Sequence, residues 1–326
     1  MQVYIRTPAR LHLGLIDLNG DLGRMFGGLG VGIDYPNTIV EATLSKNTII
    51  TGEQKELATT ITKKFFEIYP IKTQVHINIK QAIQPHTGLG SGTQLSLAIA
   101  TALAKICKIK TSTKELSLAM GRAQRTGIGT AIFDKGGFVV DGGKNIQTKD
   151  DTSFPPLIFR QPFPEKWRFM IVIPKTEKGL SGQKEKNAFT KLPPMSVEEI
   201  GKMCRLTMLK LLPALIEQDI ENFGEALAKI QIITGKYFAQ IQGGTYYSTA
   251  ATNCIEVMEK YGVYGVGQSS WGPALYGVIR KGEEKTIQAK VFSELKQSID
   301  AQVFVTKANN KGAQIRLIKE KEENRN

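Results

Sequence analysis

The glycine-rich turn Gly88-Leu89-Gly90-Ser91-Gly92-Thr93 is the part of the sequence best suited to chemistry. The alternating segment 74–83 before it predicts a β-strand, and the Ala- and Leu-rich segment 94–109 after it predicts a helix. Because the first N–H groups of a helix are unpaired and its dipole adds positive charge, this layout favours a phosphate or pyrophosphate ligand. Ser91 and Thr93 can add hydroxyl donors or a metal contact. The alternative is a tight turn of small residues that serve only packing.

A second glycine-rich turn, 265–273, lies between a predicted helix and a predicted strand. Taken alone, it could equally be an irregular loop with a packing tryptophan. Neither turn is a standard nucleotide fingerprint: the first lacks the Gly-Lys-Ser/Thr ending of a Walker A loop, and Thr93 stands where GxGxxG needs its third glycine. The side chains of the second turn that could contact a substrate are Gln268, Ser269, Ser270 and Trp271.

Near the N-terminus, Arg10, His12 and Asp17 fall in one strand-like run. Arg10 and His12 share a face at a period of two, whereas Asp17 has the opposite parity or lies just past a turn. A cation, an imidazole and a carboxylate could form a catalytic site, although a buried histidine with satisfied hydrogen bonds is the more common case. Arg24 stands beside the glycine cluster 23–32, which we expect to be a flexible lid.

Two further polar positions lie in the middle of the chain. Arg122, in the predicted helix 113–125, forms a basic rim with Arg125. Asp141 precedes a glycine pair, where a carboxylate often forms a turn. A carboxylate is also what Mg²⁺ bound to a pyrophosphate would use.

Composition limits the class of protein. The 326-residue chain has a formal net charge of +13, which would suit nucleic acid, an acidic membrane surface or small polyanions. The lysines are spread along the chain and not interleaved with aromatic residues, so RNA binding is only an alternative. No segment has the roughly 18 to 20 consecutive apolar residues of a membrane span. Three distant cysteines predict reduced thiols, and we expect a soluble cytoplasmic protein, with a homodimer left open.

The elements that must position these residues alternate between strands and helices. The pattern predicts an α+β protein with an N-terminal domain at 1–160, a proline-rich junction and a C-terminal domain at 161–326. The expected elements are strand–kink–strand at 3–15; strands at 138–141, 167–173, 274–279 and 302–306; and helices at 113–125 (with Thr113 as N-cap), 196–232 (broken near Pro213), 253–261 and 284–298.

Three segments in order, 8–17, 85–93 and 265–272, resemble the three motifs of the GHMP-kinase superfamily. The resemblance implies an N-terminal domain like ribosomal protein S5 and a ferredoxin-like C-terminal domain. More narrowly, the chain resembles the beta-ribofuranosylaminobenzene 5′-phosphate synthase family of methanopterin biosynthesis. The motifs that carry this resemblance are ARLHLGLIDLNGDLGR (9–24), GLGSGTQL (88–95), RTGIGTAIFDKGGFVVDGG (125–143), KGLSGQKE (178–185) and GQSSWGPALYG (267–277).

The family reaction joins phosphoribosyl pyrophosphate to a para-substituted benzoate, with Mg²⁺, and releases carbon dioxide and pyrophosphate. The resemblance leaves open an amino or a hydroxyl substituent. Two rivals are a small-molecule kinase on the same fold and a non-enzymatic RNA-binding protein. The implied roles are catalysis by Arg10, His12, Asp17 and Asp141; pyrophosphate binding by Gly88 to Thr93; substrate binding by Arg24, Arg122, Lys184 and Gln268 to Trp271; and metal binding by Ser91 and Asp141.

Overall fold

Two β-sheets form the framework of this computed structural model, which describes residues 1–147, 153–175 and 189–318. The first sheet has the strand order β12-β1-β2-β4-β3, and β5, β6 and β7 join it on the half of β2 nearer the N-terminus. All its pairs are antiparallel except β3 with β4. Its strands are β1 (Gln2–Asp17), β2 (Arg24–Leu44), β3 (Ile49–Gly52), β4 (Val75–Gln81), β5 (Phe138–Asp141), β6 (Lys144–Asn145), β7 (Leu157–Gln161) and β12 (Gln314–Ile318).

The glycine cluster 23–32 is not a lid, because most of it lies inside β2, paired with β1. A Cβ atom on Gly28 or Gly30 would lie only 2.6 or 2.3 Å from the side chain of Ile128. The glycines therefore let a helix pack directly against the strand. The strand–kink–strand prediction is confirmed in part: the register of β1 shifts between Thr7 and Ala9, at Pro8, and again between His12 and Gly14, but the pairing continues through both irregularities as one long strand.

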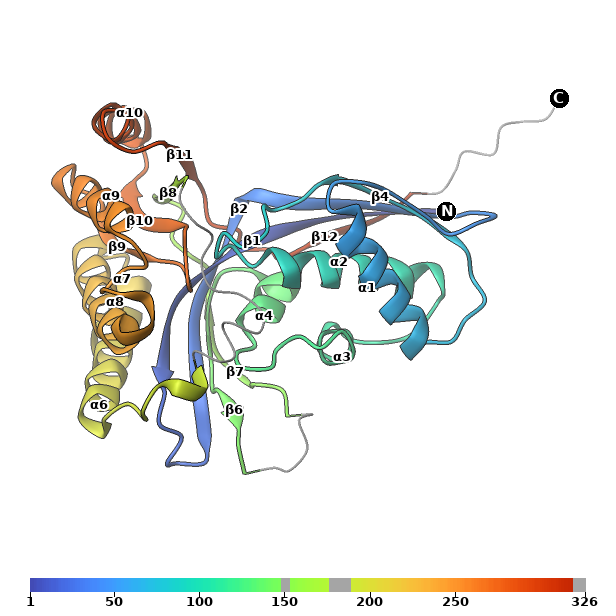
Figure 1. The fold of residues 1–326 in the computed structure, drawn as a ribbon, viewed down its shortest axis with the longest axis horizontal. Coiled ribbons are helices and arrows are strands. Elements are labelled where there is room, and N and C mark those ends of the chain that lie inside the picture. Colours follow the sequence, from blue (N-terminus) through green and yellow to red (C-terminus); the bar gives the residue numbers. More distant parts are fainter. Residues whose placement is uncertain (148–152, 176–188, 319–326) are drawn as a thin grey trace.

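Four helices lie on one side of the first sheet: α1 (Lys55–Ile68), α2 (Ser91–Ile106), α3 (Thr113–Ala119) and α4 (Ile128–Lys135) (Figure 1). The predicted strand before α2 and the buried α2 itself are confirmed. The helix expected at 113–125 ends at Ala119, and its N-cap is Ser112 in a capping box with Glu115. Arg122 and Arg125 consequently lie in the connection to α4 rather than on a helix rim.

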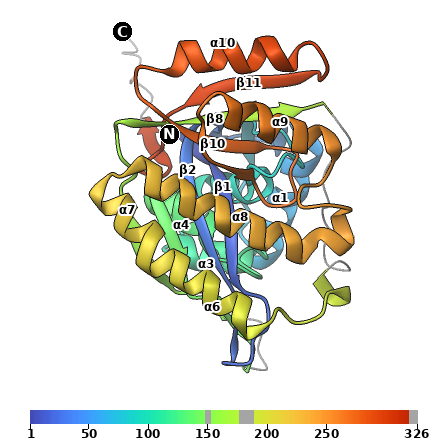
Figure 2. The ribbon, with the colours of Figure 1, turned by 90° about the vertical axis from the view of Figure 1, so that its left-hand side faces the viewer.

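The second sheet is antiparallel with the order β11-β8-β10-β9, which is fourth-first-third-second along the chain. This is the ferredoxin-like arrangement that the family resemblance implies. Figure 2 shows the helices of this half facing the viewer. The elements are β8 (Trp167–Pro174), α6 (Val197–Leu206), the π-helical turn η1 (Thr207–Leu211), α7 (Leu212–Glu217), α8 (Ile220–Gln242), α9 (Thr249–Lys260), β9 (Tyr264–Gln268), β10 (Leu275–Arg280), α10 (Glu284–Leu295) and β11 (Ala301–Thr306).

The predicted break near Pro213 is confirmed in part: the π-helical turn η1 interrupts the α-helix and ends at Leu211. Pro213 lies in the first turn of α7, which follows η1 directly, and the chain leaves the helical conformation at Gln218, which has a left-handed backbone. Asp219 then caps a separate helix, α8, by accepting a hydrogen bond from the N–H of Asn222. Because α8 contacts both β9 and β1, it is the element that joins the two sheets.

One hydrophobic cluster spans the two halves. It contains Leu11 and Leu13 of β1 together with Phe169 of β8 and Phe223 of α8. After the second sheet the chain returns to the first sheet, where β12 pairs with β1. The division at residue 160 stays a prediction. All three cysteines are free, and among the described residues no helix is long and apolar enough to cross a membrane.

Candidate active site

The first glycine-rich turn has the backbone that only glycine adopts easily. Gly88 and Gly90 have φ angles of 81° and 78°, and Gly90 is the N-cap of α2. A Cβ atom on Gly88 would lie 2.3 Å from the carbonyl oxygen of Ser269, and one on Gly90 would lie 3.1 Å from Cβ of Arg10. The turn therefore contacts the other two motifs without any space for side chains.

Hydrogen bonds join the three motifs. The Ser269 hydroxyl donates to the carbonyl of Gly88 (2.7 Å) and accepts from the backbone N–H of His12 (3.0 Å). The Arg10 guanidinium donates to the same Gly88 carbonyl (3.1 Å), and the Arg10 N–H donates to the carbonyl of Leu89 (2.9 Å). Ser269 is thus a buried connector between strand and turn, and does not line the cavity described next.

A cavity of about 380 Å³ lies beside this junction, and one of its sides is strongly basic. Arg10, Arg122 and Arg125 line it, and none of its lining residues in the described part of the chain is a carboxylate. Arg122 donates two hydrogen bonds to the Ser96 hydroxyl, at 2.8 and 3.2 Å, which fixes its guanidinium beside α2. Burial lowers the pKa of Arg122, so its charge is poorly solvated and would gain from an anion. Thr93 lines the same side.

His12 faces the cavity as a neutral imidazole. Burial, and secondarily the charge of Arg10, lower its pKa to about 3. The ring can therefore donate and accept hydrogen bonds near neutral pH, but it is a poor general acid.

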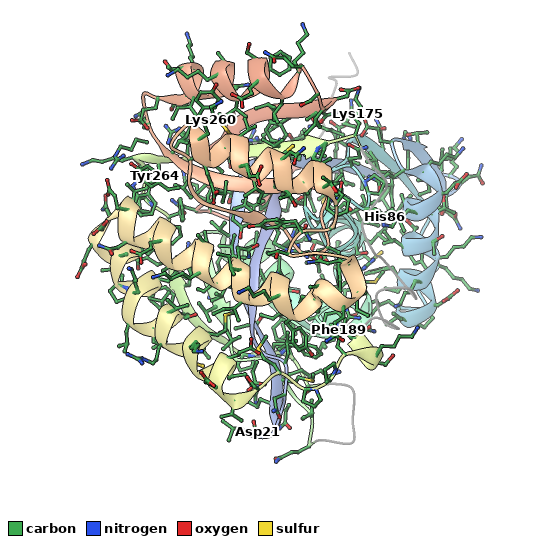
Figure 3. The ribbon with its side chains drawn as sticks, turned by 60° about the vertical axis from the view of Figure 1, so that its left-hand side comes forward. Asp21, His86, Lys175, Phe189, Lys260 and Tyr264 are labelled. Atoms are coloured by element: carbon green, nitrogen blue, oxygen red, sulfur yellow. The ribbon has the colours of Figure 1, made fainter. Side chains whose placement is uncertain are left out.

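Another part of the cavity lining is aromatic. The Trp271 ring lies 4.7 Å from that of Phe238 and 5.9 Å from that of Phe189. The Arg125 guanidinium lies 4.3 Å from the centre of the Phe189 ring, so the basic and aromatic sides meet there. Figure 3 shows Phe189 beside the end of α8.

Helix α8 contributes one face to the cavity, which no motif in the sequence indicated. The face has the spacing i, i+3, i+4, i+7, i+11, which is one stripe of a helix. Gln231 donates to the carbonyl of Leu13 (2.6 Å) and accepts from the N–H of Gln268 (2.9 Å). The hydroxyl oxygen of Thr234 is buried with no hydrogen-bond partner among the described residues. The residues of this face are Gln231, Thr234, Gly235, Phe238 and Gln242.

The structure brings together only part of the predicted site. Asp17 accepts hydrogen bonds from the N–H groups of Asn19 and Gly20 at the tip of the β1–β2 hairpin, which Asp21 marks in Figure 3. Arg24 donates to the carbonyls of Gly142 and Gly143, also outside the cavity. Lys184 lies outside the described residues. The predicted residues that line the cavity are Arg10, His12, Thr93, Arg122, Gln268, Ser270 and Trp271.

Asp141 is buried and surrounded by backbone donors. Its carboxylate accepts from the N–H groups of Gly28 (3.1 Å), Gly143 (2.9 Å) and Gly127 (2.8 Å), the last at the start of α4. The Asp141 side chain therefore caps the N-terminus of α4 from a neighbouring strand, and it does not line the cavity. Its catalytic and metal-binding roles remain predictions. Within the described ranges, no group of three His, Cys, Asp or Glu side chains could hold a metal ion.

Comparison with known proteins places the chain in a family. The models for the N-terminal and C-terminal domains of GHMP kinases match residues 56–142 and 211–297. A beta-ribofuranosylphenol 5′-phosphate synthase of Archaeoglobus fulgidus is 34% identical, covering 96% of this chain and 99% of that protein. A synthase of the same name from Methanothermobacter thermautotrophicus is 33% identical over 96% of this chain and 98% of that protein. The chain belongs to the beta-ribofuranosylphenol 5′-phosphate synthase family, within the GHMP-kinase superfamily.

Solved structures share the fold at low sequence identity. The homoserine kinase of Cytophaga hutchinsonii superimposes with a TM-score of 0.67 at 17% identity, covering 96% of this chain and 97% of that one. A structure titled MDDEF in complex with MVAPP, AMPPCP and magnesium has a TM-score of 0.64 at 14% identity, covering 97% of this chain and 98% of that one. The GHMP-kinase fold is therefore established, and one protein with this fold binds magnesium.

Proposed function

We propose that this protein joins phosphoribosyl pyrophosphate to a para-substituted benzoate, giving a C-riboside 5′-phosphate, carbon dioxide and pyrophosphate. The observation that carries the proposal is a cavity lined by three arginines and by Phe238 and Trp271, with no carboxylate among its lining residues within the described ranges. Two anions must meet there, and the arginines reduce the repulsion between them. The aromatic side fits the benzoate ring.

The chemistry needs charge stabilisation more than proton transfer. The bond between the anomeric carbon and pyrophosphate breaks, and its electron pair leaves with the pyrophosphate. The ring carbon that bears the carboxylate bonds to the cationic anomeric carbon, and carbon dioxide departs, returning an electron pair to the ring. Arg10, Arg122 and the N–H groups at the start of α2 are suited to stabilise the leaving pyrophosphate. No proton changes hands, which agrees with a neutral His12 acting only through hydrogen bonds.

The acceptor we favour is 4-hydroxybenzoate. The synthases of A. fulgidus and M. thermautotrophicus are both named for a ribofuranosylphenol product, which requires a hydroxyl substituent. We propose that Mg²⁺ arrives with the diphosphate of the substrate, where such an ion keeps several waters and needs few protein ligands. Of the two residues predicted to bind it, Asp141 fits poorly, because its carboxylate is occupied by backbone N–H groups. No step is therefore assigned to the ion.

Product analysis tests the proposal. Protein incubated with Mg²⁺, phosphoribosyl pyrophosphate and 4-hydroxybenzoate should release carbon dioxide and pyrophosphate in equal amounts. Arg122→Gln should lower kcat/KM by roughly 10- to 100-fold, because a charge-assisted contact to an anion is worth about 1.5–3 kcal/mol. Lys285→Gln, on the exposed side of α10, is the matched control and should behave as wild type. ADP formation from ATP and homoserine, with no carbon dioxide from benzoates, would establish the kinase alternative instead.

A further inference from the structure

A second cavity, of about 370 Å³, lies where the chain passes from the second sheet back to the first. We call it the junction cavity. Its walls come from β1, β2, the turn before β8, the turn after β10 and the connection between β11 and β12. It shares no lining residue with the candidate active site. Along β1 its Arg6 stands four residues from Arg10, a separation of about 13 Å in an extended strand.

Positive charge is in excess around the junction cavity. Five cations line it, Arg6, Arg168, Lys281, Lys307 and Lys311, against the two carboxylates of Asp34 and Glu165. Lys307 pairs with Asp34 at 3.3 Å, and Arg168 pairs with Glu284 at 3.3 Å. Within the described part of the chain, no carboxylate lies within ion-pair distance of Arg6, Lys281 or Lys311. Three cations without a carboxylate partner in the described ranges, from three separate segments, thus line one cavity, and Arg6 also donates to the backbone carbonyl of Asp34 at 3.4 Å.

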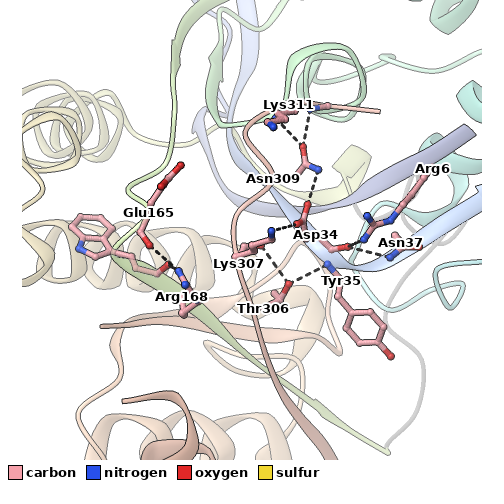
Figure 4. A network of polar contacts seen from close by, with 12 residues as sticks. Arg6, Asp34, Tyr35, Asn37, Glu165, Arg168, Thr306, Lys307, Asn309 and Lys311 are labelled. Atoms are coloured by element: carbon pink, nitrogen blue, oxygen red, sulfur yellow. Dashed lines mark hydrogen bonds and ion pairs between the residues drawn. The ribbon is translucent and has the colours of Figure 1, made fainter. Parts of the chain in front are cut away.

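The walls are held in place by side-chain hydrogen bonds, which Figure 4 shows in part. Asn309 donates to the Asp34 carboxylate at 2.7 Å and accepts from the N–H groups of Lys311 and Gly312. Asn310 donates to and accepts from the backbone of Phe163, at 2.9 and 2.8 Å. The β11–β12 connection is therefore fixed to both sheets before any ligand binds, which lowers the entropic cost of binding.

The shape and the remaining side chains indicate a small ligand. Phe163 and Trp167 line the cavity but are only 1% and 3% exposed, so they offer no aromatic platform for a nucleic-acid base. A volume of about 370 Å³ holds a small molecule. Several cations that line one cavity match a multiply charged anion better than a single carboxylate.

We propose that the junction cavity binds a small phosphorylated anion at a site separate from the candidate active site. The anion would contact Arg6 of the first sheet together with Lys281, which follows the second sheet. It would therefore hold the two sheets against each other. The same two sheets frame the candidate active site, so this site is placed to influence it. The proposal does not depend on the proposed reaction.

Calorimetric titration with inorganic pyrophosphate, without metal ion at physiological salt, tests this proposal. The double variant Lys281→Ala/Lys311→Ala should lose one bound pyrophosphate per chain relative to wild type. The control Lys285→Ala/Lys296→Ala removes the same charge from two exposed lysines elsewhere and should lose none. Arg122→Gln should weaken pyrophosphate binding at the candidate active site and leave the junction cavity unchanged. A failure of the proposed function is therefore distinguished from a failure of the junction-site proposal. If the first double variant binds as many pyrophosphates as wild type, or if the control loses as much, the junction site does not exist.

Discussion

Asp141 illustrates how one residue type supports two interpretations that sequence cannot separate. A carboxylate beside glycine pairs could hold a metal or form a turn. The structure surrounds it with N–H donors and leaves it 1% exposed. Burial raises its pKa from 3.8 to about 6, and the backbone hydrogen bonds only partly oppose this. Such an environment is fixed by residues distant in the chain, Gly28 among them.

The raised pKa of Asp141 predicts a pH-dependent loss of stability. The folded protein holds the proton of the Asp141 carboxyl group more tightly than the unfolded chain does. The stabilisation that this proton provides is therefore complete below pH 4. It is lost as the pH rises to about 6, because the unfolded state releases the proton first. The difference between 3.8 and about 6 corresponds to about 3 kcal/mol. Asp141→Asn removes the titrating group, so the free energy of unfolding of this variant should not show this decrease with rising pH.

Urea unfolding of wild type and Asp141→Asn at pH 4 and pH 7 measures the effect. Stability relative to the variant should decrease by up to about 3 kcal/mol between the two pH values. His12, whose lowered pKa acts in the opposite direction, is present in both proteins and cancels from the difference. Equal pH profiles for the two proteins would mean that Asp141 titrates normally.

At the scale of elements, local sequence patterns predicted the helices and strands whose formation depends mainly on residues close together in the chain. The strand before the first glycine-rich turn and the helix after it are present because alternation and Ala/Leu content act locally. The glycine cluster in β2 was misread, since a flexible loop and a strand under a closely packed helix both need glycine. The face of α8 was missed because the predicted helix stopped at residue 232, before Thr234 and Phe238.

Gly88 should be the least replaceable glycine of the first turn. In Gly88→Ala the new Cβ atom would meet the Ser269 carbonyl at 2.3 Å, and a backbone carbonyl cannot move aside cheaply. Gly243 has a similar φ angle, 84°, with nothing within 4 Å of an added Cβ atom. Both variants share the left-handed backbone cost of about 1–2 kcal/mol, so the difference between them isolates the clash.

We expect Gly88→Ala to be about 1–3 kcal/mol less stable than Gly243→Ala in urea unfolding. It should also bind pyrophosphate more weakly, because the turn must shift away from Ser269. If the two variants have the same free energy of unfolding, the contact between the two glycine-rich turns is looser than the structure indicates.

At the scale of the whole molecule, the candidate active site is a product of long-range contacts. The basic side comes from the first 125 residues and most of the aromatic side from α8 and the 265–273 turn. Sequence patterns identified Arg10 and Trp271 separately. They could not show that these residues border one cavity, since more than 250 positions separate them. The net charge of +13 likewise did not indicate where an anion would bind, whereas the fold places several cations at each of two cavities.

The chain contains two tryptophans, which gives a direct probe of the aromatic side. Trp167→Phe leaves Trp271 as the only reporter, and Trp271→Phe leaves Trp167, which does not line the candidate active site. Addition of 4-hydroxybenzoate should change the emission of the first protein saturably and leave the second unchanged, without any need for turnover. In the Trp167→Phe background, Phe238→Leu should weaken binding by roughly 2- to 10-fold, since an aromatic pair adds about 0.5–1.5 kcal/mol. Phe292→Leu, at an exposed position of α10, is the control. A saturable response from Trp167 alone would place the benzoate elsewhere, and the assignment of the aromatic side would then be wrong.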